Sequence, residues 1–211
     1  MTNFNPIPLL CLWCLILLAT AACAPQKQPP ERNFFVLEAA RAVDNHWHEP
    51  QKILSVRDFE VSPGFRGKEI VYRKGRGQSE ADFYNQYFIP PGAMLTDATR
   101  EWLADSGMFE AVIPMGSHKE ADYLLEGAVI SLYGDFQERR EPAAVLRMQF
   151  LLLEDDGPDY RLLMHRTYRE QVSLPGTGAG HVVQGLNKAL TRILTQLEKD
   201  MASAIPDNNQ R

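Results

Sequence analysis

The chain contains few cysteines and carries no charge in its first 22 residues. Its three cysteines, Cys11, Cys14 and Cys23, all lie near its start. Beyond Cys23 there is therefore no thiol for a disulfide, for a cysteine nucleophile or for a cysteine metal ligand. The globular part must be held together by its hydrophobic core, which a chain of about 180 residues is long enough to build.

Signals for nucleic-acid binding, cofactor binding and hydrolysis are also missing. The net charge is −5 and no basic stripe stands out, which argues against nucleic-acid binding. Residues 176–180 (GTGAG) precede an expected helix, but a GxGxxG loop would need glycine where His181 stands. No serine lies in a GxSxG motif; those considered are Ser55, Ser79 and Ser173. We therefore predict no cofactor and no catalytic residue, and we expect that the protein is not an enzyme.

The histidines offer only a weak metal signal. His46 and His48 would share one side of a strand, with Asp44 and Glu49 close by. No further Cys or His follows nearby, so we interpret this segment as a surface loop and predict no metal site. The remaining candidates are isolated in the sequence, namely His118 and His165.

The start of the chain has the pattern of an export signal. Residues 9–19 form an apolar run that is too short to cross a bilayer. The small residues that follow, TAAC at 20–23, resemble the lipobox of bacterial lipoproteins, with Thr20 where that motif usually has Leu. The resemblance implies that residues 1–22 are a signal peptide and that Cys23 is the lipid attachment site. The alternatives are an ordinary signal peptide cut near Ala22 and a membrane-buried anchor.

The residues after Cys23 predict a tether. Residues 24–32 (APQKQPPER) are polar and rich in Pro and Gln. Nine residues of polyproline-like chain reach about 28 Å. Ala24, rather than Asp, follows the cysteine. By resemblance to enterobacterial lipoproteins, this favours the outer membrane.

Residues 33–203 read as one α+β domain, followed by a polar tail at 204–211. Two amphipathic helices are expected, at 93–106 and at 182–201, where Leu190 and Ile193 lie on the apolar stripe. Strand patterns are expected at 34–37, 53–61, 69–73, 83–88, 109–114, 123–133, 143–153 and 160–174. We expect a mainly antiparallel sheet with both helices packed on one face.

Two finer expectations concern single segments. The short strands 34–37 and 69–73 are the expected edges of the sheet, where a partner strand could be added. The aromatic residues of segment 83–88 are expected in the core rather than in a lipid-binding slot. Gly107 is placed to end the first helix in a left-handed conformation.

The order of segments resembles one known family. After the lipobox come FFVL (34–37), ILSVRDFEVSPGFRGKEIVYR (53–73), ADFYNQYFIPPGAML (81–95), LADSGMFEAV (103–112), ADYLLEGAV (121–129) and the closing amphipathic helix. This series is similar to the ABC-type transport auxiliary lipoproteins, the PqiC-like family, over nearly all of the mature chain. Many members carry Trp within the segment FYNQYF, where this chain has Tyr87 and Phe88.

The resemblance implies a function without catalysis. It implies a lipoprotein of the outer membrane that faces the periplasm, is acylated with chains such as palmitate, and serves an ABC-type system for lipid transport between the two membranes. The implied partner is an MCE-domain protein, and self-association is also implied. The alternatives are an assembly factor for another envelope machine, of the lipopolysaccharide transport or secretin type, and a periplasmic hydrolase.

Overall fold

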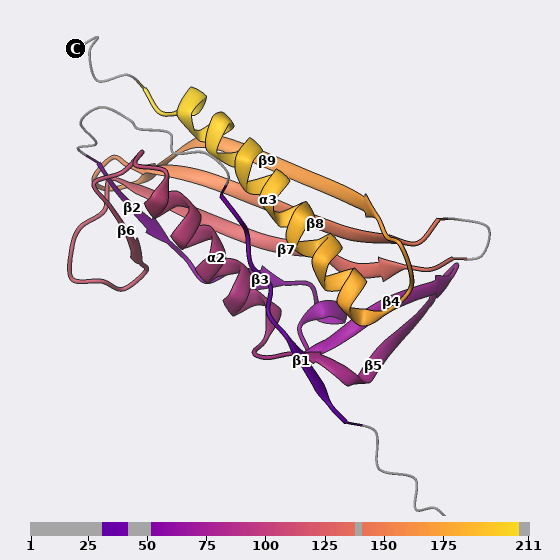
Figure 1. Cartoon of the computed structure of the whole chain (residues 1–211). Helices are drawn as coiled ribbons and strands as arrows, with labels where there is room; N and C mark the ends of the chain where they lie inside the picture. Colours follow the sequence, from indigo (N-terminus) through magenta and orange to yellow (C-terminus); the bar gives the residue numbers. More distant parts are fainter. Residues whose placement is uncertain (1–30, 42–51, 138–140, 207–211) are drawn as a thin grey trace, which may run out of the picture. The chain divides into compact units, whose positions relative to one another are not determined.

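The computed structural model describes residues 31–41, 52–137 and 141–206 of the chain (Figure 1). The chain divides into two compact units, Met1–Glu31 and Arg32–Arg211, and all elements below belong to the second. Its strands are β1 (Asn33–Phe35), β2 (Ile53–Val56), β3 (Glu60–Val61), β4 (Glu69–Gly75), β5 (Gln78–Tyr87), β6 (Ala111–Pro114), β7 (Tyr123–Asp135), β8 (Ala143–Asp155) and β9 (Tyr160–Ser173). Its helices are η1 (Pro63–Phe65), α2 (Pro91–Asp105) and α3 (Ala179–Ala204).

Strand β7 is the centre of the single sheet. Strand β8 pairs along one side of β7, and β9 pairs with β8. On its other side β7 meets three strands in succession: β2 near its start, β3 in its middle and β4 at its end. Strand β6 extends the sheet beyond β2, and β5 and β1 extend it beyond β4. The sheet therefore has one long side and one side that is divided into two parts.

The expected α+β fold is confirmed, but the expected strand directions are partly wrong. Of the eight strand pairings in the described residues, five are parallel and three are antiparallel. The antiparallel pairings of β7 with β8 and of β8 with β9 are the long ones. Turn residues between two strand patterns indicate antiparallel strands that are neighbours in the sequence. The parallel pairings join segments that are distant in sequence, and they leave no local signal.

The hairpin of β8 and β9 shows how alternation builds the core. Alternate residues of β8 are completely buried on one side of the sheet, namely Ala144, Leu146, Met148, Phe150 and Leu152, whereas Arg147 is exposed. The hairpin closes through the turn between β8 and β9, in which Gly157 adopts a φ of 88°. At this position glycine avoids the strain that a side chain would cause.

Both helices lie on the same face of the sheet, as expected (Figure 1). Helix α2 begins at Pro91, where the missing N–H has no intrahelical partner to lose. Past its C-terminus Gly107 has a φ of 71°, which confirms the expected left-handed residue. Helix α3 buries a continuous stripe in which Leu190 is 0% and Ile193 is 1% exposed, so both predicted core positions are confirmed.

The contact between α3 and the sheet is close at Gly185. A Cβ atom added there would lie 2.5 Å from Leu174 Cδ2 and 2.7 Å from Ala144 Cβ. Real side chains do not approach so closely. Glycine at position 185 therefore allows α3 to pack close to β8.

The expected strand at 53–61 is divided into β2 and β3. Its backbone still follows β7, since Arg57 N–H donates to Leu125 O and Ser62 N–H donates to Val129 O. Between the two strands Phe59 turns into the core over Gly127, where an added Cβ would lie 2.4 Å from the ring. Packing of this aromatic ring therefore interrupts the regular alternation.

One of the two expected sheet edges is correct. Strand β1 lies at an edge, but β4 lies between β5 and β7 and is an interior strand. Among the described strands, β3, β6 and β9 also pair on one side only. The prediction for 69–73 is wrong because β4, although short, also pairs with β7. This long strand comes from a distant part of the chain, and its pairing places β4 inside the sheet.

Candidate functional site

Two clusters of exposed apolar side chains lie at opposite ends of the strand order β1-β5-β4-β7-β2-β6. The first surrounds a depression where β2, β6 and β7 meet, and we call it the end depression; its large exposed apolar residues are Met115 and Tyr160. The second lies on β1 and β5 and just beyond, and we call it the aromatic patch; its residues are Phe34, Val36, Phe83, Tyr84 and Phe88.

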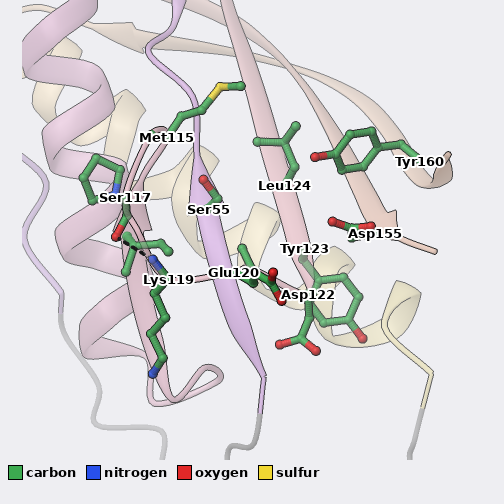
Figure 2. Close-up of a pocket in the computed structure, with 14 residues that line it drawn as sticks. Ser55, Met115, Ser117, Lys119, Glu120, Asp122, Tyr123, Leu124, Asp155 and Tyr160 are labelled. Carbon is green, nitrogen blue, oxygen red and sulfur yellow. Dashed lines mark hydrogen bonds between the residues drawn. The ribbon is translucent and has the colours of Figure 1, made fainter. Parts of the chain in front are cut away.

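The end depression has a volume of about 670 Å³ (Figure 2). Its walls come from β2, from the segment that joins β6 to β7, from the start of β7, and from the hairpin of β8 and β9. Its lining mixes apolar, hydroxyl and charged groups; those labelled in Figure 2 are Ser55, Met115, Ser117, Lys119, Glu120, Asp122, Tyr123, Leu124, Asp155 and Tyr160.

Asp122 fixes the floor of the depression. Its carboxylate accepts from Lys52 Nζ at 2.7 Å and from the Ile53 backbone N–H at 2.8 Å, while its own N–H donates to Ile53 O. Burial opposes ionisation of this carboxyl group, but the hydrogen bonds from Lys52 and Ile53 outweigh burial, and the pKa of Asp122 is lowered. Asp122 is therefore ionised at neutral pH and holds β2 against β7.

Neighbouring polar groups in the depression are structural as well. Burial, and then the negative charge of Glu154, raise the pKa of the Tyr123 phenol, which stays protonated at neutral pH. Lys119 lies after β6 and pairs with Glu110, which lies just before β6, at 3.0 Å. Since Asp122 is paired and Tyr123 keeps its proton, neither is a ready base.

The aromatic patch arises from strand alternation. Phe35 and Tyr87 are paired in register and turn toward the core. The residues beside them point outward: Phe34 is 54% exposed and Phe88 is 63% exposed, and their rings meet edge to face at 6.5 Å. The expectation that the aromatic residues of 83–88 lie in the core is correct for Tyr87 and wrong for Phe83, Tyr84 and Phe88.

Asp82 holds the bend that presents two of these rings. Its Oδ1 accepts from the N–H groups of Tyr84 at 2.9 Å and Asn85 at 3.0 Å, and its Oδ2 accepts from Tyr72 Oη at 2.8 Å. Burial opposes ionisation of Asp82, but these bonds together with one from the Asn85 side chain lower its pKa. The carboxylate is thus used inside the bend, and Phe83 and Tyr84 project outward from it.

The structure does not bring the residues singled out in the sequence into one site. Cys23, His46 and His48 lie outside the described residues. His165 lies on the outer face of β9, with its Nε2 2.7 Å from Gln149 Nε2, and His118 is exposed. Within residues 31–41, 52–137 and 141–206, no three His, Cys, Asp or Glu side chains gather in a way that could hold a metal ion.

A buried charged cluster was missed by the sequence reasoning. Glu198 of α3 is 5% exposed and accepts from Arg41 Nη1 at 2.7 Å, from Arg41 Nη2 at 2.9 Å and from Trp102 Nε1 at 2.8 Å. Its position continues the steps of four from Leu190 and Leu194, and this spacing could have indicated a buried carboxylate. The cluster joins α3 to α2 and to the segment after β1.

Solved structures share this fold. A crystal structure of a protein from Xanthomonas campestris matches 77% of this chain and 91% of that chain, with a TM-score of 0.66 and 23% identity. A second, of an uncharacterized protein, matches 81% of this chain and 99% of that chain, with a TM-score of 0.63 and 14% identity. No curated protein matches the chain.

The fold and the clusters at its ends define an α+β domain without an assembled catalytic constellation in its described part. The chain belongs to the family of ABC-type transport auxiliary lipoprotein components, whose model matches residues 35–198. The protein is accordingly an auxiliary transport component and a membrane-anchored lipoprotein of the cell envelope. Among the described residues, no helix is long and apolar enough to cross a membrane.

Proposed function

We propose that the protein is an outer-membrane lipoprotein accessory of an ABC-type system that moves lipid between the inner and outer membranes. Acylation of Cys23 anchors it, and residues 24–32 connect the anchor to the domain. The domain faces the periplasm, self-associates and binds a periplasm-spanning MCE-domain partner. The observation that carries this proposal is the family match over residues 35–198.

The opposed clusters support a docking role. Arg32 is the first residue of the compact unit and lies beside Phe83 of the aromatic patch, so the tether enters at that end. The end depression lies at the other end of the strand order, where the short strand β6 is the edge among the described strands. An edge strand beside exposed apolar side chains can accept a partner segment. We therefore propose that the partner docks at the end depression.

Co-purification tests the proposed function. The membrane-extracted protein is purified from its own cells in mild detergent, and the proteins recovered with it are identified by mass spectrometry. We expect an MCE-domain protein and the components of its ABC transporter. Recovery of a lipopolysaccharide transport or secretin machine in their place would contradict the proposal.

Two variants of equal exposure test the docking surface. Tyr160, at the end depression, and Phe83, in the aromatic patch, are each 57% exposed. We expect Tyr160→Ser to reduce recovery of the partner and Phe83→Ser to leave it unchanged in detergent. The opposite pattern would indicate that the partner docks at the aromatic patch.

A further inference from the structure

We propose that the aromatic patch rests on the lipid bilayer, with its rings in the interfacial region of the membrane to which the chain is anchored. This inference rests on the proposed acylation of Cys23, and it adds a second, non-covalent contact with the membrane. The patch comprises Phe34, Val36, Phe83, Tyr84 and Phe88.

The patch gathers several exposed apolar side chains on two paired strands. Phe83 and Phe88 are 57% and 63% exposed, and Val36 and Tyr84 are 52% and 43% exposed. The exposed rings meet in two pairs, Phe34 with Phe88 and Phe83 with Tyr84. Exposed apolar side chains that gather in this way indicate a contact surface. Tyrosine is one of the residues that favour the membrane interface, because its ring is apolar and its hydroxyl group is polar.

The patch is held in place by its surroundings. The Asp82 carboxylate ties the bend below Phe83 and Tyr84, and the Gln86 side chain donates to Phe83 O at 3.1 Å. The rings of Phe83 and Tyr84 meet edge to face at 5.3 Å. A surface that is ordered before contact loses little conformational entropy on binding.

Two cations accompany the rings. The guanidinium of Arg32 lies 4.5 Å from the centre of the Phe83 ring, and Lys68 Nζ donates to Phe88 O at 3.0 Å. The carboxylate of Asp82 is turned into its bend, where four donors surround it. Cationic groups beside apolar rings suit a bilayer surface that carries anionic phosphate groups.

The length of the tether favours the bilayer, rather than another molecule, as the partner of the aromatic patch. Cys23 and Arg32 are nine residues apart in the sequence, so fully extended chain between them spans at most about 32 Å. Arg32 contacts the Phe83 ring of the patch, whereas the end depression lies on β2, β6 and the start of β7, at the other end of the strand order. A short tether thus keeps the patch closer than the end depression to the anchored acyl chains.

Site-specific labelling tests the inference in the processed lipoprotein. Once the signal peptide is removed, Cys23 is the only native cysteine left, and acylation blocks its thiol. The variants Phe83→Cys and Phe88→Cys thus each offer one thiol for an environment-sensitive nitrobenzoxadiazole label. The labelled proteins are reconstituted in vesicles of phosphatidylethanolamine and phosphatidylglycerol, with and without brominated acyl chains. We expect a blue shift of the emission and a loss of intensity with the brominated lipids.

Matched controls come from β9, where Tyr160 lines the end depression and Leu162 follows two residues later. Tyr160 is 57% and Leu162 is 53% exposed, so Tyr160→Cys and Leu162→Cys place the same label in similarly exposed apolar sites. We expect no quenching at either control position. Unchanged melting temperatures establish that all four variants remain folded.

Three outcomes would overturn the inference. Labels at 83 and 88 that behave like those at 160 and 162 would show that the patch is not a specific membrane contact. Labels at 83 and 88 that are shielded from aqueous iodide but not quenched by brominated lipid would show that a second copy of the chain covers the patch. An intact mass without acyl chains would contradict the anchor itself, and this measurement precedes the fluorescence experiment, so failure of the proposed function is distinguished from failure of the patch.

Discussion

At the scale of single residues, the buried charges explain how distant elements are held together. Glu198 accepts hydrogen bonds from Arg41 and Trp102, so one carboxylate connects α3, α2 and the segment that follows β1. The Arg41 guanidinium also lies 5.1 Å from the centre of the Trp102 ring. A buried pair of this kind is costly to break because its charges have been removed from water.

Glu198→Ala should therefore lower the free energy of unfolding by about 3–5 kcal/mol, as expected when one partner is removed from a buried ion pair. Urea denaturation of the purified protein measures this change. The matched control is Glu110→Ala, because Glu110 and Lys119 form a pair whose side chains are 53% and 52% exposed. Its effect should be at most about 1 kcal/mol. Equal effects of the two substitutions would contradict the structural role of Glu198.

Asp135 makes the stability of the fold depend on acid pH. Its side chain is 4% exposed and accepts from Arg73 Nη2 at 2.7 Å and from Gln137 Nε2 at 2.9 Å. Burial opposes ionisation of this carboxyl group, but the hydrogen bonds from Arg73 and Gln137 outweigh it, so the pKa of Asp135 lies below its ordinary value of 3.8.

Because the pKa of Asp135 is lower in the folded state, the unfolded chain takes up this proton first as the pH falls. The resulting contribution to stability is present above the ordinary carboxyl pKa of about 4 and is lost as the pH falls through the folded pKa. Asp135→Asn should be less stable than the wild type at neutral pH and should lose less stability on acidification. Urea midpoints measured across the acid range test this, and parallel curves for the two proteins would contradict it.

At the scale of elements, α3 contributes most to the face of the sheet that is covered by helices. Its buried stripe runs from Val182 to Met201 and packs on β8 and β9. Leu190 is at the middle of this stripe and is fully buried, whereas Lys188 lies on the exposed face.

Leu190→Ala should lower the free energy of unfolding by about 2–5 kcal/mol, since it removes buried methyl groups and leaves a cavity against the sheet. Lys188→Ala on the same helix should change it by no more than about 0.5 kcal/mol. Thermal and urea denaturation of both variants measure the difference. An unchanged melting temperature for Leu190→Ala would mean that the stripe does not support the fold.

At the scale of the whole molecule, the two apolar clusters lie at opposite ends of the strand order. Arg32 contacts Phe83 of the aromatic patch, and the end depression lies on β2, β6 and the start of β7. In the proposed function, the patch faces the membrane and the depression faces the partner.

Cys23→Ser should yield a protein that is either unprocessed or released from the membrane in soluble form. A single acyl chain binds membranes only marginally, whereas the several chains of a mature lipoprotein hold it firmly. Membrane fractionation and intact-mass measurement of the two proteins test this. A Cys23→Ser protein that is still processed and still found in the outer membrane would contradict lipid attachment at Cys23.

Sequence patterns were sufficient for the elements themselves. Helix α3 was expected at 182–201 and spans Ala179–Ala204, and the strands expected at 143–153 and 160–174 are present as β8 and β9. These signals are local, because helical spacing, alternation and turn residues act within a few positions of one another. The ordered set of segments also indicated the family, since it extends over nearly the whole mature chain.

Only the tertiary structure decided which surfaces are buried and which strands meet. The local sequence does not tell whether Phe83, Tyr84 and Phe88 face a core or solvent, because the answer depends on whether another layer covers them. The place of β4 inside the sheet, and the meeting of Glu198 with Arg41, likewise bring together residues that are far apart in the sequence. Such contacts are set by packing of the complete chain, and for that reason the end depression and the aromatic patch became visible only in the fold.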